Sequence, residues 1–508
     1  MTGVDEHIEV EIKLDAAEDI GLPDLSEIPG VASIGKPLEQ HLSATYFDTP
    51  DLRLARHGIT LRRRTGGADD GWHLKHPKVG DARVEVHRPL GRSTRTPPRA
   101  LADLVRVHVR DTRLVSAAML TTHRLATPLL DGRGAVLAEV ADDRVEGQVA
   151  GVASPVTWRE IEVELVGGSR TILMAVGDRL RQAGAVPGSS SSKLARVLRT
   201  VGEPGPWANH DEPETRSDAG SILRAHLTEQ VAALVRRDPL ARIDAPDAVH
   251  KMRVATRRLR SALATFRPLL DRESIEPVRD ELRWLGQVLG GPRDEEVMHA
   301  RLLELLAAEP PELVLGPVRR RVDIELRARH RTKHRQLVAE LDGPRYFRLL
   351  DELDALALRP PLTGQAAEPA VDVLPSLVAR TRRRLLGLAA EADAAATADA
   401  RAVALHDVRK AAKRSRYAGE AVAPVFGAKA TRFAAEMERL QEVLGEQQDS
   451  LVTRGVLREL GVQAHLAGEN GFAFGRLHGL EVGRAERAEA GYTDALAAVA
   501  GKPPRWLR

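Results

Sequence analysis

The sequence predicts an α+β multidomain chain, in which a β-rich N-terminal part precedes an all-helical C-terminal part. Residues 1 to about 200 contain short segments of alternating apolar and polar residues, separated by Gly, Pro or Asp. This pattern is typical of antiparallel strands. From residue 221 onward the chain is rich in Leu, Ala, Arg and Glu, which favours helices. Two blocks of this second part recur in the same order, which predicts a duplicated helical bundle.

Composition restricts the chemistry that this chain can perform. A length of 508 residues is too great for one core and suggests several folded units. Cysteine is absent, which excludes disulfides, thiolate nucleophiles and cysteine-based zinc sites, so any metal must bind carboxylates or histidines. Aromatic residues make up only 3%, which leaves little material for the stacking platforms of single-strand nucleic-acid binders. We therefore do not expect nucleic acid as a partner.

Charge and hydropathy indicate a cytoplasmic protein whose charges are sorted locally. The chain begins with acidic and polar residues, which predicts no secretory signal. No stretch approaches about 18 consecutive apolar residues, so we expect no membrane span. The net charge of +3 is the balance of 75 basic and 72 acidic residues. Function must then follow from where these charges lie along the chain.

The first predicted strand, HIEVEIKL at residues 7–14, separates its residues into two faces. Glu9, Glu11 and Lys13 alternate with apolar residues, as in a strand with one polar face. The later predicted strands repeat this separation. Their charged face carries, in chain order, Arg62, Arg64, Lys75, Arg83, Glu85, Arg124, Glu139, Asp143, Glu160, Glu162 and Glu164. The alternation with Glu139 favours Asp143 over Asp142, whereas His73 and His87 are equally well explained as supporting or solvated residues.

Acidic strands and basic strands in one sheet predict a closed tunnel with a charged interior. A closed antiparallel sheet leaves no unpaired edge and brings the opposite charges to face one another. Its apolar outer surface would be covered by helices, such as the one predicted at 169–183 with Gly184 as its stop. Clustered carboxylates bind hard divalent cations, and arginines match phosphate oxygens. The interior therefore predicts a site for a metal-bound chain of phosphates.

The same motifs resemble the CYTH domain, or triphosphate tunnel metalloenzyme, over residues 5–200. They are the ExExK of the first strand, the YFDT turn, the arginines at 62 and 64, RxE at 83–85 and the late ExExE. The resemblance implies an eight-stranded antiparallel tunnel that binds triphosphate with Mg²⁺ or Mn²⁺. The family includes inorganic triphosphatases, thiamine triphosphatases and a class of adenylyl cyclases.

Carried over to this chain, the resemblance implies a role for each of the charged residues. The metal would be held by Glu9, Glu11, Glu162 and Glu164, with Asp143 beside them. The triphosphate would be held by Lys13, Arg62, Arg64, Lys75, Arg83, Arg124 and Lys193. We expect Glu9, Glu11 and Lys13 to form the catalytic group, but the sequence does not identify a general base. The plain alternative is a sheet whose polar face is merely solvated.

A Pro-, Gly- and acid-rich segment at residues 202–220 predicts a linker. We therefore expect a tunnel domain at 1–201, a linker at 202–217 and a helical domain at 218–508. A second break at 359–372 divides the helical domain into halves of about 218–358 and 373–500.

Two blocks of the first half recur in the second half in the same order. The first block, HKMRVATRRLRSAL at 250–263, aligns with HDVRKAAKRSRYAG at 406–419. The second block, LGQVLGGPRDEEV at 285–297, aligns with LQEVLGEQQDSLV at 440–452.

The first recurrent block places cations on one helix face in each half. His250, Arg253, Arg257 and Arg260 fall within roughly an 80° arc at helical spacing, and His406, Arg409, Lys413 and Arg416 repeat this arc. A single arginine-rich helix is usually a solvated face, but the recurrence favours an anion site. Arg- and Lys-rich runs at 319–321, 327–335 and 380–384 would extend this basic surface.

This pattern resembles the CHAD domain over about 218–500. The resemblance implies two four-helix bundles related by pseudo-twofold symmetry, which bind inorganic polyphosphate and associate with polyphosphate granules. The eight residues of the two arcs would be the binders, with Lys251, Arg258, Lys410 and Arg414 flanking them.

Together the two resemblances predict metal-dependent hydrolysis of inorganic triphosphate, or of a related triphosphate, coupled to polyphosphate binding. Three alternatives stay open: a non-catalytic polyphosphate binder, an adenylyl cyclase, and a nucleic-acid binder. The cyclase needs an adenine pocket that no residues of the sequence indicate. The physiological triphosphate, the preferred metal and the oligomeric state are not predicted.

Overall fold

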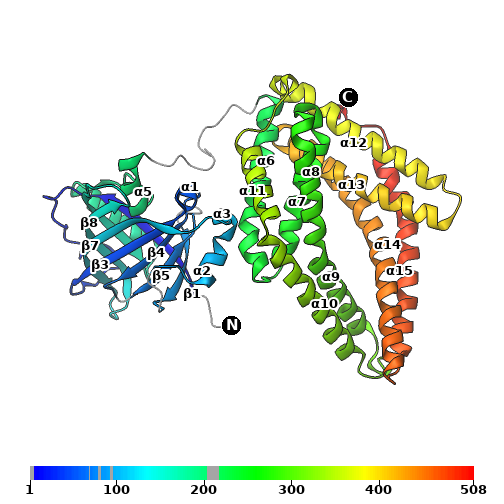
Figure 1. The fold of residues 1–508 in the computed structure, drawn as a ribbon, viewed down its shortest axis with the longest axis horizontal. Coiled ribbons are helices and arrows are strands. Elements are labelled where there is room, and N and C mark those ends of the chain that lie inside the picture. The colour runs from blue at the N-terminus through cyan, green and yellow to red at the C-terminus, as the bar shows by residue number, and fades with distance from the viewer. Residues whose placement is uncertain (1–4, 68, 78–81, 92–94, 203–216, 508) are drawn as a thin grey trace. The chain divides into compact units, whose positions relative to one another are not determined.

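The computed structural model describes residues 5–67, 69–77, 82–91, 95–202 and 217–507, and for residues 5–9, 82, 83 and 399 it describes the backbone alone. The chain forms two compact units, residues 1–209 and 210–508. The first is an antiparallel sheet with helices, and the second is helical throughout (Figure 1). This confirms the predicted fold class.

The sheet of the first unit closes on itself (Figure 1). Its strands follow the order β1-β6-β5-β4-β3-β7-β8-β9, and β9 pairs again with β1. Two short strands, β2 (Ser33–Ile34) and β10 (Val186–Pro187), join β7 and β1. The ring strands are β1 (Asp5–Asp15), β3 (Leu38–Asp48), β4 (Thr60–Thr65), β5 (Gly71–Lys75), β6 (Ala82–Pro89), β7 (Val115–Leu130), β8 (Val136–Val149) and β9 (Val156–Leu165).

The predicted number of eight strands is therefore wrong, because the described sheet has ten. The two additional strands are only two residues long and lie outside the closed ring. Neither carries an alternating sequence long enough to be recognised. They lengthen the pairing of β7 and β1 and do not change the closure.

The strand β1 closes the ring because it pairs with both β6 and β9, the two ends of the strand order. Its first half pairs with β6, and its second half pairs with β9, where Lys13 lies opposite Glu162. The alternate residues Ile12 and Leu14 point away from the interior. They pack with β8, β9 and the helix α4 (Arg170–Gln182) in one apolar cluster. This is the covering helix that the sequence predicted, and Gly184 follows it with a φ of +105°.

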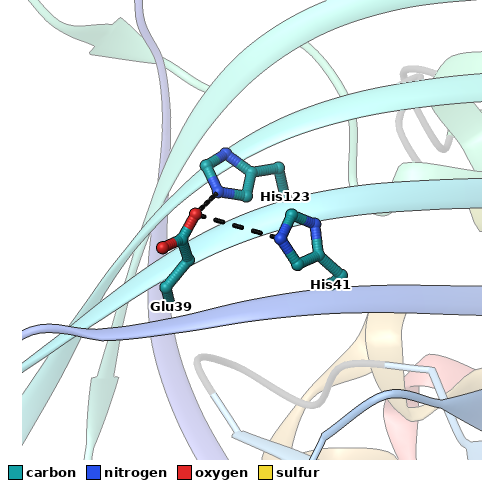
Figure 2. A group of neighbouring side chains, drawn as sticks. All are labelled: Glu39, His41 and His123. Carbon is teal, nitrogen blue, oxygen red and sulfur yellow. Dashed lines mark hydrogen bonds and ion pairs between the residues drawn. The ribbon is translucent and has the colours of Figure 1, made fainter.

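The remaining outer wall is covered in part by short helices. Buried residues of β4, β5 and β6, such as Leu61 and Trp72, pack against α1 (Arg53–Arg56), α2 (Arg99–Leu104) and α3 (Arg106–Val109). On β3 and β7 some outward positions, such as Glu39, His41 and His123, are polar and not covered by a helix. His41 lies directly opposite His123 there, and both side chains point out of the ring (Figure 2).

The helix α5 (Lys193–Leu198) fills one end of the tunnel. Its Leu194, Val197 and Leu198 pack against Tyr46, Leu120 and Trp158, which share the inward face of their strands. The side-chain hydroxyl of Ser192 accepts a hydrogen bond from the Ala195 backbone N–H and begins this helix. This packing carries Lys193, the first residue of α5, into the tunnel interior.

The second unit consists of two helical halves that correspond in sequence order. The first contains α6 (Ala219–Arg242), α7 (Ala248–Thr265), α8 (Arg272–Val288), α9 (Gly290–Ala308), α10 (Val318–Leu341) and α11 (Pro344–Leu358). The second contains α12 (Ala370–Asp393), α13 (Ala398–Phe426), α14 (Ala428–Leu466) and α15 (Phe472–Ala500). The blocks aligned in the sequence match α7 with α13, and the α8–α9 pair with the single long α14. With α8 and α9 counted as one, the first half has five α-helical segments and the second has four.

Buried apolar residues on α7 and α13 explain why the basic faces of these two helices are turned away from the apolar core. In α7, Met252, Leu259 and Leu263 are fully buried on a different face from Arg253, Arg257 and Arg260. In α13, Val408, Ala412 and Val422 are buried in the same way. Within the described part of the chain, none of the helices has both the length and the apolar character required to cross a bilayer.

Candidate functional site

The tunnel contains a cavity of about 320 Å³ whose wall is dominated by charged side chains. Its charged residues come from β1, β4, β5, β6, β7, β8, β9, α5 and the segment after β4. They are Lys13, Arg62, Arg64, Asp69, Lys75, Glu85, Arg124, Glu139, Glu162, Glu164 and Lys193. Seven ring strands and α5 therefore contribute charge to one enclosed space, as the alternation predicted.

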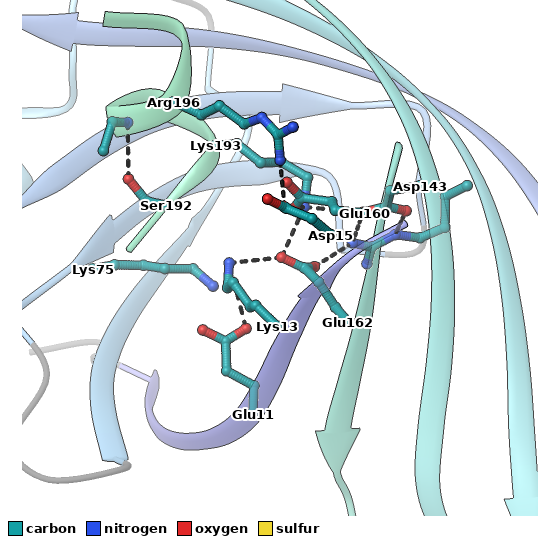
Figure 3. Close-up of polar contacts among 12 residues, drawn as sticks. Glu11, Lys13, Asp15, Lys75, Asp143, Glu160, Glu162, Ser192, Lys193 and Arg196 are labelled. Atoms are coloured by element: carbon teal, nitrogen blue, oxygen red, sulfur yellow. Dashed lines mark hydrogen bonds and ion pairs between the residues drawn. The ribbon is translucent and has the colours of Figure 1, made fainter. Parts of the chain in front are cut away.

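At the α5 end of the cavity, three carboxylates surround a single ammonium group (Figure 3). The Nζ atom of Lys193 lies 2.9 Å from Asp143 Oδ2, 2.6 Å from Glu160 Oε1 and 2.8 Å from Glu162 Oε1. Arg124 donates two hydrogen bonds of 2.7 Å to Asp143 and one of 2.8 Å to Glu162. Asp143 is completely buried. These cations therefore neutralise this group of carboxylates within the protein.

The mutual contacts favour the charged forms of Glu162, Lys193 and Lys13. Burial favours the neutral acid, but Lys13, Lys193 and Arg124 hold the pKa of Glu162 well below its ordinary value. Burial also disfavours charged lysine, yet Glu162, Asp143 and Glu160 raise the pKa of Lys193 well above its ordinary value. Glu162 and Glu11 raise the pKa of Lys13 against the same effect of burial. These three side chains therefore carry full charges at neutral pH.

A second group of carboxylates lies along the junction of β1, β8 and β9. Glu11 is directly opposite Glu164 in the β1–β9 pair, and Glu164 is opposite Glu139 in the β8–β9 pair. The side chain of Glu11 is only 6% exposed, and its Oε2 atom lies 3.6 Å from Lys13 Nζ. The register therefore places three carboxylates side by side on adjacent strands. An all-oxygen donor set of this kind fits a hard divalent cation such as Mg²⁺ or Mn²⁺.

Basic residues occupy β4 and β5, across the cavity from β9. Arg62 and Arg64 project inward, Arg62 donates a 3.4 Å hydrogen bond to the Tyr46 hydroxyl, and Arg64 forms an ion pair with Asp69. Burial, with Arg62 and Arg124 nearby, lowers the pKa of Arg64 to about 10. Lys75 Nζ lies 3.3 Å from Glu85 Oε2. These three cations line the space that an anion would fill.

The structure also shows which predicted residues lie elsewhere or are not described. The side chains of Glu9 and Arg83 fall outside the described part of the chain, although their backbones pair in register. Asp143 points inward as expected, and Asp142 points outward, where Arg159 binds it at 2.8 Å. His73 is buried and contacts Glu85 at 2.7 Å, so it supports a carboxylate of the wall.

The helical unit contains a second basic cavity, where α7 and α8 of the first half meet α13 of the second. Its volume is about 250 Å³. Its lining comprises Arg257, Arg260, Ser261, Arg279, Arg283, Lys410, Lys413, Arg414 and Tyr417. Seven cations line it together with one serine and one tyrosine, and the lining includes no carboxylate. Such an excess of positive charge has an anion as its natural complement.

Burial and mutual repulsion lower the pKa of several of these cations. Burial, followed by Arg409, Arg257 and Arg253, lowers the pKa of Lys413 to about 7. Burial and the neighbouring Arg253, Arg409 and Arg416 also lower the pKa of Arg257, against the opposing effect of Tyr417. Residues from α7 and α13 therefore lie within electrostatic range of one another, as the duplicated pattern predicted.

The second duplicated block explains how two of these arginines are held. The guanidinium of Arg253 lies 2.7 Å from Asp294, and that of Arg409 lies 3.8 Å from Asp449. A Cβ atom at Gly290 would lie 3.4 Å from Arg253, and one at Gly445 would lie 3.2 Å from Arg409. Each glycine thus lets a guanidinium pass close to the α9 or α14 backbone toward its aspartate. The sequence alignment contained both Gly–Asp pairs, but their role was missed.

The other predicted binders lie at the edges of this cavity. His250 is half-buried and His406 is exposed, and partial burial with nearby cations lowers the pKa of both. Arg416 lies 2.8 Å from both Glu420 and Glu438. Of the further basic runs, Arg321 binds Glu469 and Arg329 binds Glu459, so these cations are already neutralised. Arg279 and Arg283 of α8 were missed, because they stand outside both duplicated arcs.

Comparisons with known proteins agree with this division of the chain. A CYTH domain model matches residues 7–198, and a CHAD domain model matches residues 225–458. An uncharacterised protein of Mycobacterium tuberculosis is 39% identical over 495 residues, which cover 95% of this chain and 94% of that protein.

Two solved structures are similar to part of the chain. PptA from Streptomyces chartreusis is 23% identical with a TM-score of 0.46, and the match covers 55% of this chain and all of that one. The CHAD domain from the plant Ricinus communis is 25% identical with a TM-score of 0.46, and the match covers 57% of this chain and 93% of that one.

Proposed function

This chain belongs to the proteins that join a CYTH domain to a CHAD domain, and on that basis we propose that its tunnel hydrolyses inorganic triphosphate with Mg²⁺ or Mn²⁺. CYTH domains are metal-dependent and bind triphosphates, and their members are typically triphosphatases or cyclases. The observation that carries the proposal is the sorting of charge in one cavity. Arg62, Arg64 and Lys75 lie on one wall, and the carboxylates of β1, β8 and β9 lie on the other.

The two groups of carboxylates would have different roles in this reaction. The first group is close enough together to hold an ion, but the ammonium group of Lys193 already forms ion pairs with all three of its carboxylates, those of Asp143, Glu160 and Glu162. They hold Lys193, Lys13 and Arg124 at fixed positions, with their ammonium and guanidinium groups in the cavity. Glu11, Glu139 and Glu164 would hold the divalent metal, together with Glu9 of the same strand. When bound, the metal neutralises phosphate oxygens and favours in-line attack by water.

The basic residues would bind and orient the substrate. Arginine matches a phosphate with two parallel hydrogen bonds, and lysine adds a compact charge. Arg62, Arg64 and Lys75 would take the phosphate oxygens on one side, and Lys13 and Arg124 on the other. Ion pairs inside the protein fix these groups before the substrate arrives, which lowers the reorganisation that binding requires.

Product analysis tests this assignment against the cyclase alternative. Purified protein is incubated with tripolyphosphate, thiamine triphosphate or ATP, in Mg²⁺, in Mn²⁺ and in EDTA. We expect orthophosphate from tripolyphosphate in either metal and none in EDTA. No described cavity residue is a clear reader of adenine, since the aromatic wall is limited to Tyr46. Cyclic AMP and pyrophosphate as the main products from ATP would contradict the proposal.

For the helical unit we propose binding of long-chain inorganic polyphosphate, without a metal, at the cavity between α7, α8 and α13. The excess of cations supports this proposal, because a polyanion releases counterions when it binds such a surface. The position of the cavity between the two halves means that one chain of phosphates would contact both. By this proposal the protein would accompany polyphosphate granules in the cytoplasm.

The titration of Lys413 predicts that polyphosphate affinity depends on pH. Its pKa of about 7 means that it loses charge as the pH rises through neutrality. A bound polyanion favours the protonated amine, so binding takes up a proton above pH 7. Affinity should therefore fall severalfold between pH 6 and pH 8.5, as measured by fluorescence anisotropy at constant salt. Lys413→Arg keeps its charge over this range and should flatten the profile. An unchanged pH profile in that variant would remove Lys413 from the site.

A further inference from the structure

The outer wall of the tunnel carries a cluster of metal-ligating side chains that the charged interior does not include. Glu39 and His41 lie on β3, and His123 lies on the neighbouring β7. All three point away from the cavity, because the alternate residues Gln40, Leu42 and Thr122 line it. Figure 2 shows the Glu39 carboxylate directed toward both imidazole rings.

The geometry of this cluster is that of three donors around a common point. His123 Nε2 lies 2.6 Å from Glu39 Oε1, and His41 Nε2 lies 3.9 Å from the same atom. The two rings stack with centroids 4.8 Å apart. One ligand atom from each residue lies within 4.8 Å of the other two. Donors on one tetrahedral zinc ion are about 3.3 Å apart, as ligand distances of about 2.0 Å require.

The backbone places these donors without strain. His41 and His123 are directly opposite in the antiparallel register, and Glu39 is two residues from His41 on the same face. Side chains at such positions have Cβ atoms about 4.5–5.5 Å apart in any antiparallel pair. Only side-chain rotations are needed to bring the donors around an ion. Arg144, the next neighbour of His123 on β8, lies 3.3 Å from Glu18, so an acidic partner already engages this nearby cation.

We propose that Glu39, His41 and His123 bind one divalent transition-metal ion, of the Zn²⁺ or Cu²⁺ type, on the outside of the tunnel. Two imidazoles and one carboxylate suit such borderline ions, whereas Mg²⁺ prefers oxygen donors alone. The side chains are 62%, 79% and 40% exposed, so an ion reaches them directly and water completes its coordination. The bound ion links β3 to β7 on the face opposite the substrate cavity.

Calorimetric titration of the full-length protein with Zn²⁺ in excess Mg²⁺ tests this site, because Mg²⁺ occupies the oxygen-only positions. We expect one zinc site per chain that is at least tenfold weaker in His41→Gln and in His123→Gln. His465→Gln, which changes an exposed histidine of α14, is the matched control and should bind zinc as the wild type does. Equal zinc affinity in all four proteins would overturn the proposal, as would an equal loss in the control.

Copper provides a second readout that identifies the ligands themselves. The electron paramagnetic resonance spectrum of the Cu²⁺-loaded wild type should show coupling to two imidazole nitrogens. Each single histidine variant should lose one of them, while its melting temperature in EDTA should match that of the wild type, because both rings are exposed. A wild-type spectrum without nitrogen coupling would also overturn the proposal.

Discussion

Glu11→Gln is expected to abolish metal-dependent phosphate release from tripolyphosphate while leaving the fold intact. Glu11 projects into the tunnel opposite Glu164, and its side chain is nearly buried. The amide has the same shape as the carboxylate but no charge and one fewer acceptor oxygen. Since a bound metal supplies several kcal/mol of charge stabilisation, we expect a loss of rate on the order of a hundredfold or more. Orthophosphate release at saturating Mg²⁺ is the measurement.

Two further substitutions show whether the effect belongs to the inward face. Glu146→Gln makes the same chemical change on the exposed, outward face of β8 and should keep full activity. Val10→Thr places a hydroxyl against the apolar cluster under α4 and should cost stability, about 1–3 kcal/mol, with little change in chemistry. Full turnover in Glu11→Gln with an unchanged metal requirement would remove Glu11 from the metal site. Loss of activity in a stable Val10→Thr protein would contradict the assignment of faces.

Reversal of Arg253 and Arg409 together to glutamate should nearly eliminate polyphosphate binding. The two side chains come from matching positions of the two halves and lie next to Lys413 and Arg257. Each reversal also removes the partner of an aspartate, Asp294 or Asp449, and so adds repulsion toward the ligand. We expect losses of about tenfold for each single change and a hundredfold or more for the pair. Anisotropy with labelled long-chain polyphosphate measures this.

The control for this variant must change the net charge by the same amount. Arg432 and Arg458 are exposed on α14, outside the lining of the basic cavity, and their joint reversal to glutamate should weaken binding far less. The Arg253 and Arg409 double variant should still release phosphate from tripolyphosphate at the wild-type rate. Equal losses of binding in both double variants would indicate a general charge effect and no defined site. Preference of the wild type for duplex DNA at equal salt and phosphate would make the helical unit a nucleic-acid binder.

The residues of the tunnel wall could be predicted where they depend on local periodicity. The two-residue period of a strand decides whether a side chain points in or out, so Lys13, Arg62 and Asp143 were placed on the inward face from sequence alone. The same reasoning applies to the arc of α7, where the helical period is equally local. Duplication added a second, independent signal for α13. These features required no knowledge of how distant segments pack.

Contacts between distant segments could not be predicted in this way. No local pattern indicated that Lys193 contacts Asp143, Glu160 and Glu162 at once, because its position depends on how α5 packs inside the ring. The basic runs of α10 contain more cations than α7, but in the folded protein Arg321 and Arg329 are paired with acids of α14 and the adjoining loop. A charge run therefore predicts a basic surface only when the partners of each cation are known.

The most direct test of two separate anion sites compares the effect of EDTA on both activities of one wild-type preparation. Phosphate release from tripolyphosphate and binding of long-chain polyphosphate are measured side by side in Mg²⁺ and in EDTA. The tunnel is proposed to need a metal on its carboxylates, whereas the cavity between α7, α8 and α13 is lined by cations. We therefore expect EDTA to abolish hydrolysis and to leave polyphosphate binding unchanged. Hydrolysis that persists in EDTA, or binding that disappears with it, would contradict this division of roles.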